Sequence, residues 1–186
     1  MTTALSRLPL VDRPLATGSL KTVLDGVQKQ LGGVPNFLLA LANSPPALEG
    51  VLALSGKLGA GALDPKIAER VALVLAETNS CDYCVSAHSS LADRVGLDEE
   101  EILAARRGGS SDAKADAAVR FAKSVVENRG DVTTAELGAL RDVGFSEGEI
   151  IEIIAHVGLN TLNNYIGRIG QIEIDFPKAP ALDATS

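Results

Sequence analysis

The apolar residues of this chain recur at helical spacing along nearly its whole length, rather than alternating with polar residues as in a half-buried strand. Ala, Leu, Glu and Arg outnumber the β-branched residues outside a few Val/Ile clusters, which also favours helices. The pattern predicts an all-α fold. With 186 residues, 46% of them hydrophobic, the chain can bury a core without covalent support, so we expect a single domain over residues 1–186.

Glycines, prolines and capping residues divide the chain into the expected helices. They are predicted at 19–31, 35–42, 44–58, 66–78, 80–95, a short helix from 98, 112–128, 134–143 and 146–169. Asn79 or Ser80 is expected to cap the fifth of these helices, and capping-box spacings begin at Asp98 and Ser146. Residues 1–18 should form an extended arm and residues 173–186 an irregular tail.

The charge balance argues against nucleic acid as a partner. There are 17 Lys and Arg residues against 24 Asp and Glu, which gives a net charge of −7 that repels phosphate, and aromatic residues make up only 3%. No apolar run reaches the roughly 18 residues of a membrane span, and the first residues lack the apolar core of a signal peptide. We therefore expect a cytoplasmic protein that does not bind membranes.

Both cysteines and one of the two histidines lie within eight residues, at Cys81, Cys84 and His88. In a helix these positions, i, i+3 and i+7, share one stripe of the surface. A disulfide between cysteines three residues apart closes too short a loop to stabilise a fold, and a reducing compartment would keep both as thiols. The spacing therefore indicates chemistry or metal binding.

A dithiol redox centre fits this pattern. A helix N-terminus favours the thiolate form of a cysteine, which is the reactive form. His88, one turn beyond Cys84, can take up or pass on a proton, and a carboxylate would orient its ring. The preceding helix offers two candidates, Glu69 and Glu77.

Metal binding and simple burial are the alternatives for the two cysteines. Zinc would need a fourth ligand, for which Glu69 or His156 could serve, but a structural zinc site usually has a second closely spaced pair, and the sequence has none. A thioredoxin-like site would need a βαβ pattern. We therefore expect neither a metal nor a cofactor.

The spacing of these residues resembles that of a known family. Glu69 is followed twelve residues later by Cys81-x-x-Cys84-x-x-x-His88, with Asn79 before it. This arrangement is similar to the active-site pattern of the alkyl hydroperoxidase D-like (AhpD-like) branch of the carboxymuconolactone decarboxylase family. The resemblance covers residues 48–126, while residues 34–37 and 173–177 are similar to the longer, peroxidase-related members.

The resemblance implies a helical subunit that assembles into trimers or hexamers and reduces hydroperoxides with a cysteine pair. Cys84 would attack the peroxide, Cys81 would close the disulfide, and Glu69 with His88 would relay protons. A thiol or dithiol reductant, or a reductase protein, would restore the thiols. Some family members have a histidine just before the second cysteine, where this chain has Tyr83.

Other interpretations remain open at this point. The chain could be a non-peroxidatic family member that acts on a small organic acid or lactone, or a helical binding protein with a redox-sensing disulfide. Glu77 could be a second relay carboxylate or a solvated residue at a helix end. His156, within an apolar segment, is expected to be a hydrogen-bonded core or interface histidine, and Asp82 and Tyr83 are expected at the rim of the site.

Overall fold

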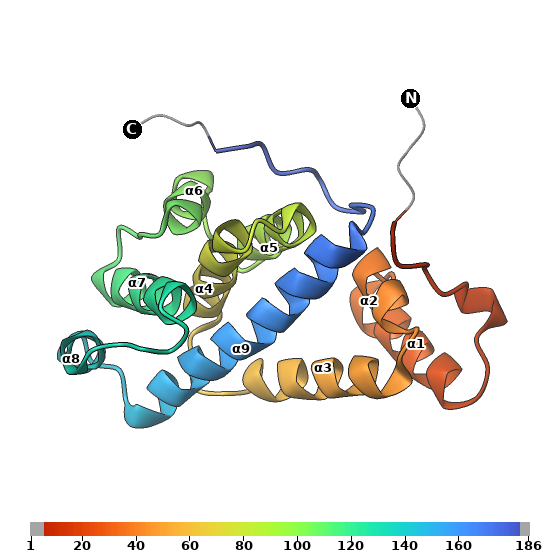
Figure 1. Cartoon of the computed structure of the whole chain (residues 1–186), viewed down its shortest axis with the longest axis horizontal. Coiled ribbons are helices and arrows are strands. Elements are labelled where there is room, and N and C mark those ends of the chain that lie inside the picture. Colours follow the sequence, from red (N-terminus) through yellow and green to blue (C-terminus); the bar gives the residue numbers. More distant parts are fainter. Residues whose placement is uncertain (1–5, 183–186) are drawn as a thin grey trace.

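The computed structural model describes residues 6–182, which form nine α-helices, a single 3-10 turn and no strand (Figure 1). The all-α prediction is confirmed, and the predicted helix boundaries agree with the structure to within about two residues. The elements are η1 (Arg13–Leu15), α1 (Gly18–Leu31), α2 (Asn36–Leu41), α3 (Pro45–Leu58), α4 (Pro65–Thr78), α5 (Asp82–Arg94), α6 (Glu99–Arg107), α7 (Ala113–Glu127), α8 (Thr134–Asp142) and α9 (Glu147–Gly170).

Helix α4 lies at the centre of the fold and packs against α5, α6, α7 and α9. Every residue from Arg70 to Ala76 is buried, because neighbouring helices cover this helix on all sides. Its Val71 and Val74 join the main core with α7 and α9, while Leu73 packs against Ala92 and residues around α6. Helix α4, which precedes the two cysteines, is therefore held in place by packing contacts on all sides.

Helix α9 is the longest helix of the described residues and runs diagonally across the molecule (Figure 1). Its 24 residues span about 36 Å and contact α3, α4, α5 and α7. The predicted capping box is present, since Ser146 and Glu149 satisfy each other's backbone N–H groups. This helix forms one wall of the site described below.

The N-terminal elements form a second apolar cluster beside α9 (Figure 1). Leu24 of α1, Leu41 of α2 and Leu48 of α3 are buried there together with Leu159 of α9. Within the predicted arm, residues 13–15 form the 3-10 turn and α1 already begins at Gly18. Residues 1–5 of the arm and 183–186 of the tail lie outside the described residues.

The predicted capping box at Asp98 is only half formed. Asp98 accepts a hydrogen bond from the backbone N–H of Glu101, but the Glu101 carboxylate turns instead to Arg70, at 2.8 Å. Burial acts to raise the pKa of Glu101, yet hydrogen bonds from Ser111, Ser110 and Arg70 outweigh it and hold the pKa at about 2. The buried Arg70 therefore binds the Glu101 carboxylate, which would otherwise accept a hydrogen bond from the backbone N–H of Asp98 and complete the capping box.

The segment after α9 is irregular over residues 172–182, as the sequence predicted, and it lies across α5 (Figure 1). The backbone N–H of Ala179 donates to Ser86 Oγ at 3.2 Å, and Arg106 donates to the Pro180 carbonyl at 2.8 Å. Of the helices described, none is long and apolar enough to cross a membrane.

Candidate active site

A tight turn between α4 and α5 places the first cysteine. The N–H of Cys81 donates to the Ala76 carbonyl and that of Ser80 to the Glu77 carbonyl, both at 2.9 Å, while Ser80 is left-handed with φ of 53°. This is the Schellman arrangement that ends a helix. Because Asn79 and Ser80 are used to end α4, the prediction that one of them caps α5 is wrong, and Cys81 itself is the N-cap.

Cys81 and Cys84 are joined by a disulfide, with their Cα atoms 5.2 Å apart. Cys84 belongs to the first turn of α5, and its backbone N–H also donates to the Cys81 sulfur at 3.3 Å. Both residues are buried, with exposed fractions of 1% for Cys81 and 5% for Cys84. The pairing is the one expected of a dithiol centre, and its reversibility stays a prediction.

Helix α9 passes directly over the disulfide at Gly167. A Cβ atom at this position would lie 2.7 Å from Cys81 Sγ and 3.3 Å from Cys84 Sγ, so only glycine fits against the sulfur pair. One turn earlier, the Asn163 carbonyl lies 4.0 Å from Cys84 Sγ. The sequence analysis missed Gly167, although a glycine inside a helix, where alanine is more stable, is itself a signal of close packing.

Gly167→Ala is expected to destabilise the oxidised protein more than the reduced protein. The new methyl group would overlap the bonded sulfurs, whereas free thiols can rotate away from it. Thermal unfolding of both redox forms measures the difference. Gly26→Ala is the control, because Gly26 lies inside α1 with open space around it, and the substitution should stabilise both forms by about 1 kcal/mol. Equal behaviour of the two variants would contradict this packing.

His88 and Glu69 meet as the sequence predicted. His88 Nδ1 lies 2.8 Å from Glu69 Oε2, and both side chains are about one-fifth exposed. The carboxylate fixes the orientation of the ring and leaves Nε2 free to exchange a proton. Within residues 6–182, no hydrogen bond joins His88 to either sulfur of the disulfide.

Glu77 has a different partner. Its carboxylate accepts from Arg106 Nε at 2.7 Å, and Arg106 is buried. Glu77 lines a separate cavity on the side of α5 covered by the C-terminal segment. Of the two candidate carboxylates, the structure therefore brings only Glu69 to His88.

A cavity of about 230 Å³ lies beside the Glu69–His88 pair, between α3, α4, α5 and α9. His156 and Asn163 of α9 also line it. His156 was expected to be a hydrogen-bonded core or interface histidine; its buried Nε2 atom has no hydrogen-bond partner among residues 6–182, so the hydrogen bond within the core is not formed, and a place at an interface stays a prediction. Sequence spacing could not place His156 here, because its position depends on how α9 packs against α4.

Tyr83 is buried, not at the rim as expected, while Asp82 is exposed. The Tyr83 hydroxyl donates to Asp175 Oδ1 at 2.8 Å and accepts from the Phe37 N–H at 3.2 Å. Burial raises the pKa of Tyr83 far above its usual range, and Asp175 raises it further. Tyr83 is thus a neutral phenol that connects α5 to α2 and to the C-terminal segment. It cannot act as a base in the way that the histidine found at this position in some family members could.

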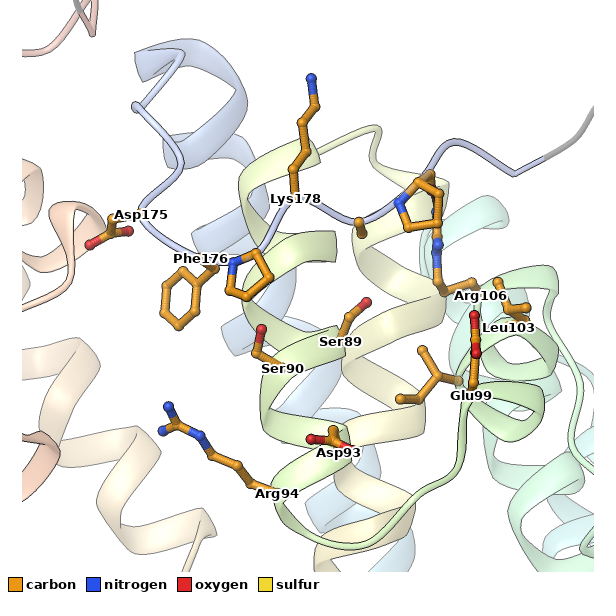
Figure 2. A pocket seen from close by; sticks show the side chains of 14 residues that line it. Ser89, Ser90, Asp93, Arg94, Glu99, Leu103, Arg106, Asp175, Phe176 and Lys178 are labelled. Atoms are coloured by element: carbon orange, nitrogen blue, oxygen red, sulfur yellow. Dashed lines mark hydrogen bonds between the residues drawn. The ribbon is translucent and has the colours of Figure 1, made fainter.

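A second cavity, of about 600 Å³, lies away from the disulfide, between α5, α6 and the C-terminal segment. Figure 2 shows Ser89 and Asp93 of α5 facing Glu99 of α6 across it, with Phe176 and Lys178 beside them. Neither cysteine nor His88 lines this cavity. His88 and Glu69 line the cavity of about 230 Å³ instead, and Cys84 adjoins that cavity through the carbonyl of Asn163.

The structure offers no arrangement for a metal ion. Within residues 6–182, no group of three or more His, Cys, Asp or Glu side chains could hold one. Most of the possible zinc ligands are engaged in other ways, since the two cysteines are bonded to each other and Glu69 binds His88.

The candidate site lies within a segment that matches a known family. The model of the carboxymuconolactone decarboxylase family matches residues 45–128, which hold Glu69, both cysteines and His88. No curated protein matches the sequence.

Several solved structures share the fold. An AhpD-core, peroxidase-related protein from Ralstonia eutropha JMP134 superposes with a TM-score of 0.85 at 22% identity, over 94% of each chain. A peroxidase-related protein from Silicibacter sp. TM1040 gives a TM-score of 0.80 at 23% identity, over 93% of this chain and 95% of the other. The debrominase Bmp8 gives a TM-score of 0.76 at 22% identity, over 90% and 91%. The resemblance drawn from the sequence is thus confirmed: the carboxymuconolactone decarboxylase family model matches residues 45–128, and the chain has the fold of the AhpD-like proteins.

Proposed function

We propose that this protein is a dithiol peroxidase, which reduces hydroperoxides with Cys84 and Cys81. One observation carries the proposal: a bonded cysteine pair at a helix N-terminus lies on the same helix as a histidine held by a carboxylate. The AhpD-like fold and the peroxidase-related neighbours support it.

The first step belongs to the reduced protein. The Cys84 thiolate attacks the terminal oxygen of the hydroperoxide, the O–O bond breaks, and Cys84 becomes a sulfenic acid. His88 takes the Cys84 thiol proton and gives it to the departing alkoxide, which leaves as an alcohol. Glu69 supports the imidazolium formed between these two transfers, at the 2.8 Å seen in the structure.

The second step forms the disulfide that the structure contains. The sulfur of Cys81 attacks the sulfenic sulfur of Cys84, the S–O bond breaks, and the hydroxide combines with the Cys81 thiol proton to leave as water. An external thiol or dithiol, free or carried by a reductase protein, then reduces the disulfide. The cycle needs a compartment that supplies such a reductant, which favours the cytoplasm.

The geometry supports Cys84 as the attacking cysteine. Cys84 lies one turn from His88, which can take up its thiol proton, whereas the N–H groups at the start of α5 favour a thiolate at either cysteine. Its sulfur also adjoins the carbonyl of Asn163, a residue that lines the cavity. Cys81 precedes the helix and is the more deeply buried of the two.

The test is consumption of cumene hydroperoxide by the reduced protein with dithiothreitol in excess. We expect many peroxide molecules to be consumed per subunit, each with one oxidised dithiothreitol. Protein alkylated at both thiols is the control and should be inactive. Oxidation that stops after one peroxide per subunit would indicate a redox sensor, and no reaction at all would favour an enzyme for a small organic acid or lactone.

A homo-oligomer is part of this proposal. Helix α9 carries a row of exposed apolar side chains at helical spacing. They are Ile151, Ile154, Leu162, Tyr165 and Ile169. A second copy of the chain would cover this stripe, as in the trimers or hexamers that the family resemblance implies.

Sedimentation should give a mass that is a multiple of 19.3 kDa. Leu162→Glu, in the middle of the stripe, should shift the protein toward monomer, because a charge would be desolvated in the interface. Leu31→Glu is the control, since Leu31 is equally exposed but lies at the end of α1. A wild-type monomer at micromolar concentration would refute the oligomer.

A further inference from the structure

His156 is a titratable residue of the candidate site that the proposed reaction does not use. It lines the same cavity as Glu69 and His88, and its Nε2 atom is buried without a hydrogen-bond partner among residues 6–182. The side-chain oxygen of Asn163, two turns further along α9, is also buried without a hydrogen-bond partner in this part of the chain. Buried polar atoms are rarely left unpaired, so both are available to a bound molecule or to water.

The charged groups around His156 are already engaged. Glu69 binds His88, and Glu152 accepts hydrogen bonds from the backbone N–H groups of Ala62 and Leu63 at 2.8–3.0 Å. Burial lowers the pKa of His156, and the attraction of Glu69 and Glu152 only partly opposes this, while His88 adds to it. At neutral pH His156 is therefore an uncharged imidazole that can still form a hydrogen bond.

The remaining wall of the cavity is largely aliphatic. Its apolar side chains come from α3, α4, α5, α9 and the segment between α3 and α4. They include Leu58, Leu63, Ala68, Ala72, Leu91 and Leu159. The volume of about 230 Å³ is several times the ~30 Å³ of one water molecule, so hydrogen peroxide alone would leave most of the cavity unfilled.

His156 and the cysteine pair lie too far apart to contact the same peroxide group. His156 and Asn163 are separated by seven residues of α9, which corresponds to about 10 Å along the helix. Asn163 is the residue whose carbonyl adjoins Cys84. A molecule that reacts at Cys84 could therefore reach His156 only with its opposite end.

We propose that His156 is a specificity-determining residue, whose neutral imidazole hydrogen-bonds an uncharged polar group at the far end of an organic substrate. The apolar body of that substrate fills the cavity, and its reactive end lies toward His88 and Cys84. A far-end carboxylate is disfavoured, because His156 carries no positive charge and Glu69 and Glu152 lie near it. That the reactive end is a hydroperoxide rests on the proposed peroxidase function, whereas the recognition of the far end by His156 does not.

Binding of redox-inert probes to the disulfide form tests the recognition without turnover. The probes are 1,8-octanediol, 1-octanol, which lacks the second hydroxyl, and 8-hydroxyoctanoate, which replaces it with a carboxylate. Calorimetry should show the diol bound about tenfold more tightly than 1-octanol, the worth of one neutral hydrogen bond, and the carboxylate bound more weakly than the diol. The imidazole ¹⁵N signals of His156 should shift on binding the diol.

His156→Leu should remove the preference for the diol, and His156→Gln, which keeps a hydrogen-bonding group, should retain part of it. Thermal unfolding checks that both variants are folded. The proposal is overturned if the wild type binds no probe, binds the diol and 1-octanol equally or prefers the carboxylate, or if His156→Leu keeps the preference. If the protein shows the preference for the diol but consumes no hydroperoxide, the recognition by His156 is supported and the proposed peroxidase function is wrong.

Discussion

Cys84→Ser is expected to abolish hydroperoxide turnover, whereas Cys81→Ser should still react once with peroxide. Cys84 supplies the thiolate that breaks the O–O bond, and a serine hydroxyl is not ionised at neutral pH and cannot replace it. In Cys81→Ser the sulfenic acid forms on Cys84 but has no neighbouring thiol to close the disulfide. A sulfenic-acid label followed by peptide mass spectrometry should therefore mark Cys84 in this variant.

The two serine variants are matched controls for each other. Both replace a buried sulfur in the same turn of α5, and both remove the disulfide. A loss of activity caused only by altered packing would affect them alike, whereas the proposed roles predict different chemistry. If Cys84→Ser turns over peroxide at the wild-type rate, the roles are reversed or the site lies elsewhere.

Local sequence signals were sufficient for the helices and for the core of the candidate site. Caps such as Asp64 before Pro65, and Ser146 with Glu149, act within one turn, so the sequence alone locates them. The same short range explains the error at the start of α5. Asn79 and Ser80 have the side chains of good N-caps, but the Schellman turn of α4 uses them first.

The choice between Glu69 and Glu77 depends on how two neighbouring helices pair. A three-residue connection makes α4 and α5 an antiparallel hairpin, so residues at similar distances from the turn face each other. His88 lies about two turns into α5 and meets Glu69, whereas Glu77 lies too close to the turn. The pairing of His88 with Glu69 could therefore be predicted from the sequence, since it follows from where α4 ends and α5 begins.

The remaining features depend on parts of the chain that are distant in sequence. Gly167 and His156 reach the site because α9 packs along α4 and α5, some 80 residues after the cysteines. Tyr83 is buried because α2 and the C-terminal segment close over it from both ends of the chain. Helical periodicity identifies the buried face of each helix, but does not tell which helix covers it.

Glu69→Gln is expected to lower hydroperoxide turnover by about 10²–10⁴-fold while the protein stays folded and oligomeric. The substitution keeps the shape of the side chain but removes the charge that supports the His88 imidazolium, 2.8 Å away. Without that charge, His88 is a weaker acceptor for the Cys84 proton and a weaker partner for the thiolate. Measured on the reduced protein, the rate of Cys84 alkylation against pH should therefore move to higher pH.

Glu77→Gln is the control that distinguishes the support of His88 by Glu69 from a general effect of losing a carboxylate on α4. Glu77 is paired with the buried Arg106, so its removal leaves an arginine charge without that partner and should lower the unfolding temperature. Turnover per folded subunit and the alkylation profile should stay as in the wild type, because Glu77 does not contact His88. If instead Glu69→Gln matches the wild type in both measurements while Glu77→Gln is impaired, the proton relay runs through Glu77, and the role assigned to the Glu69–His88 pair is wrong.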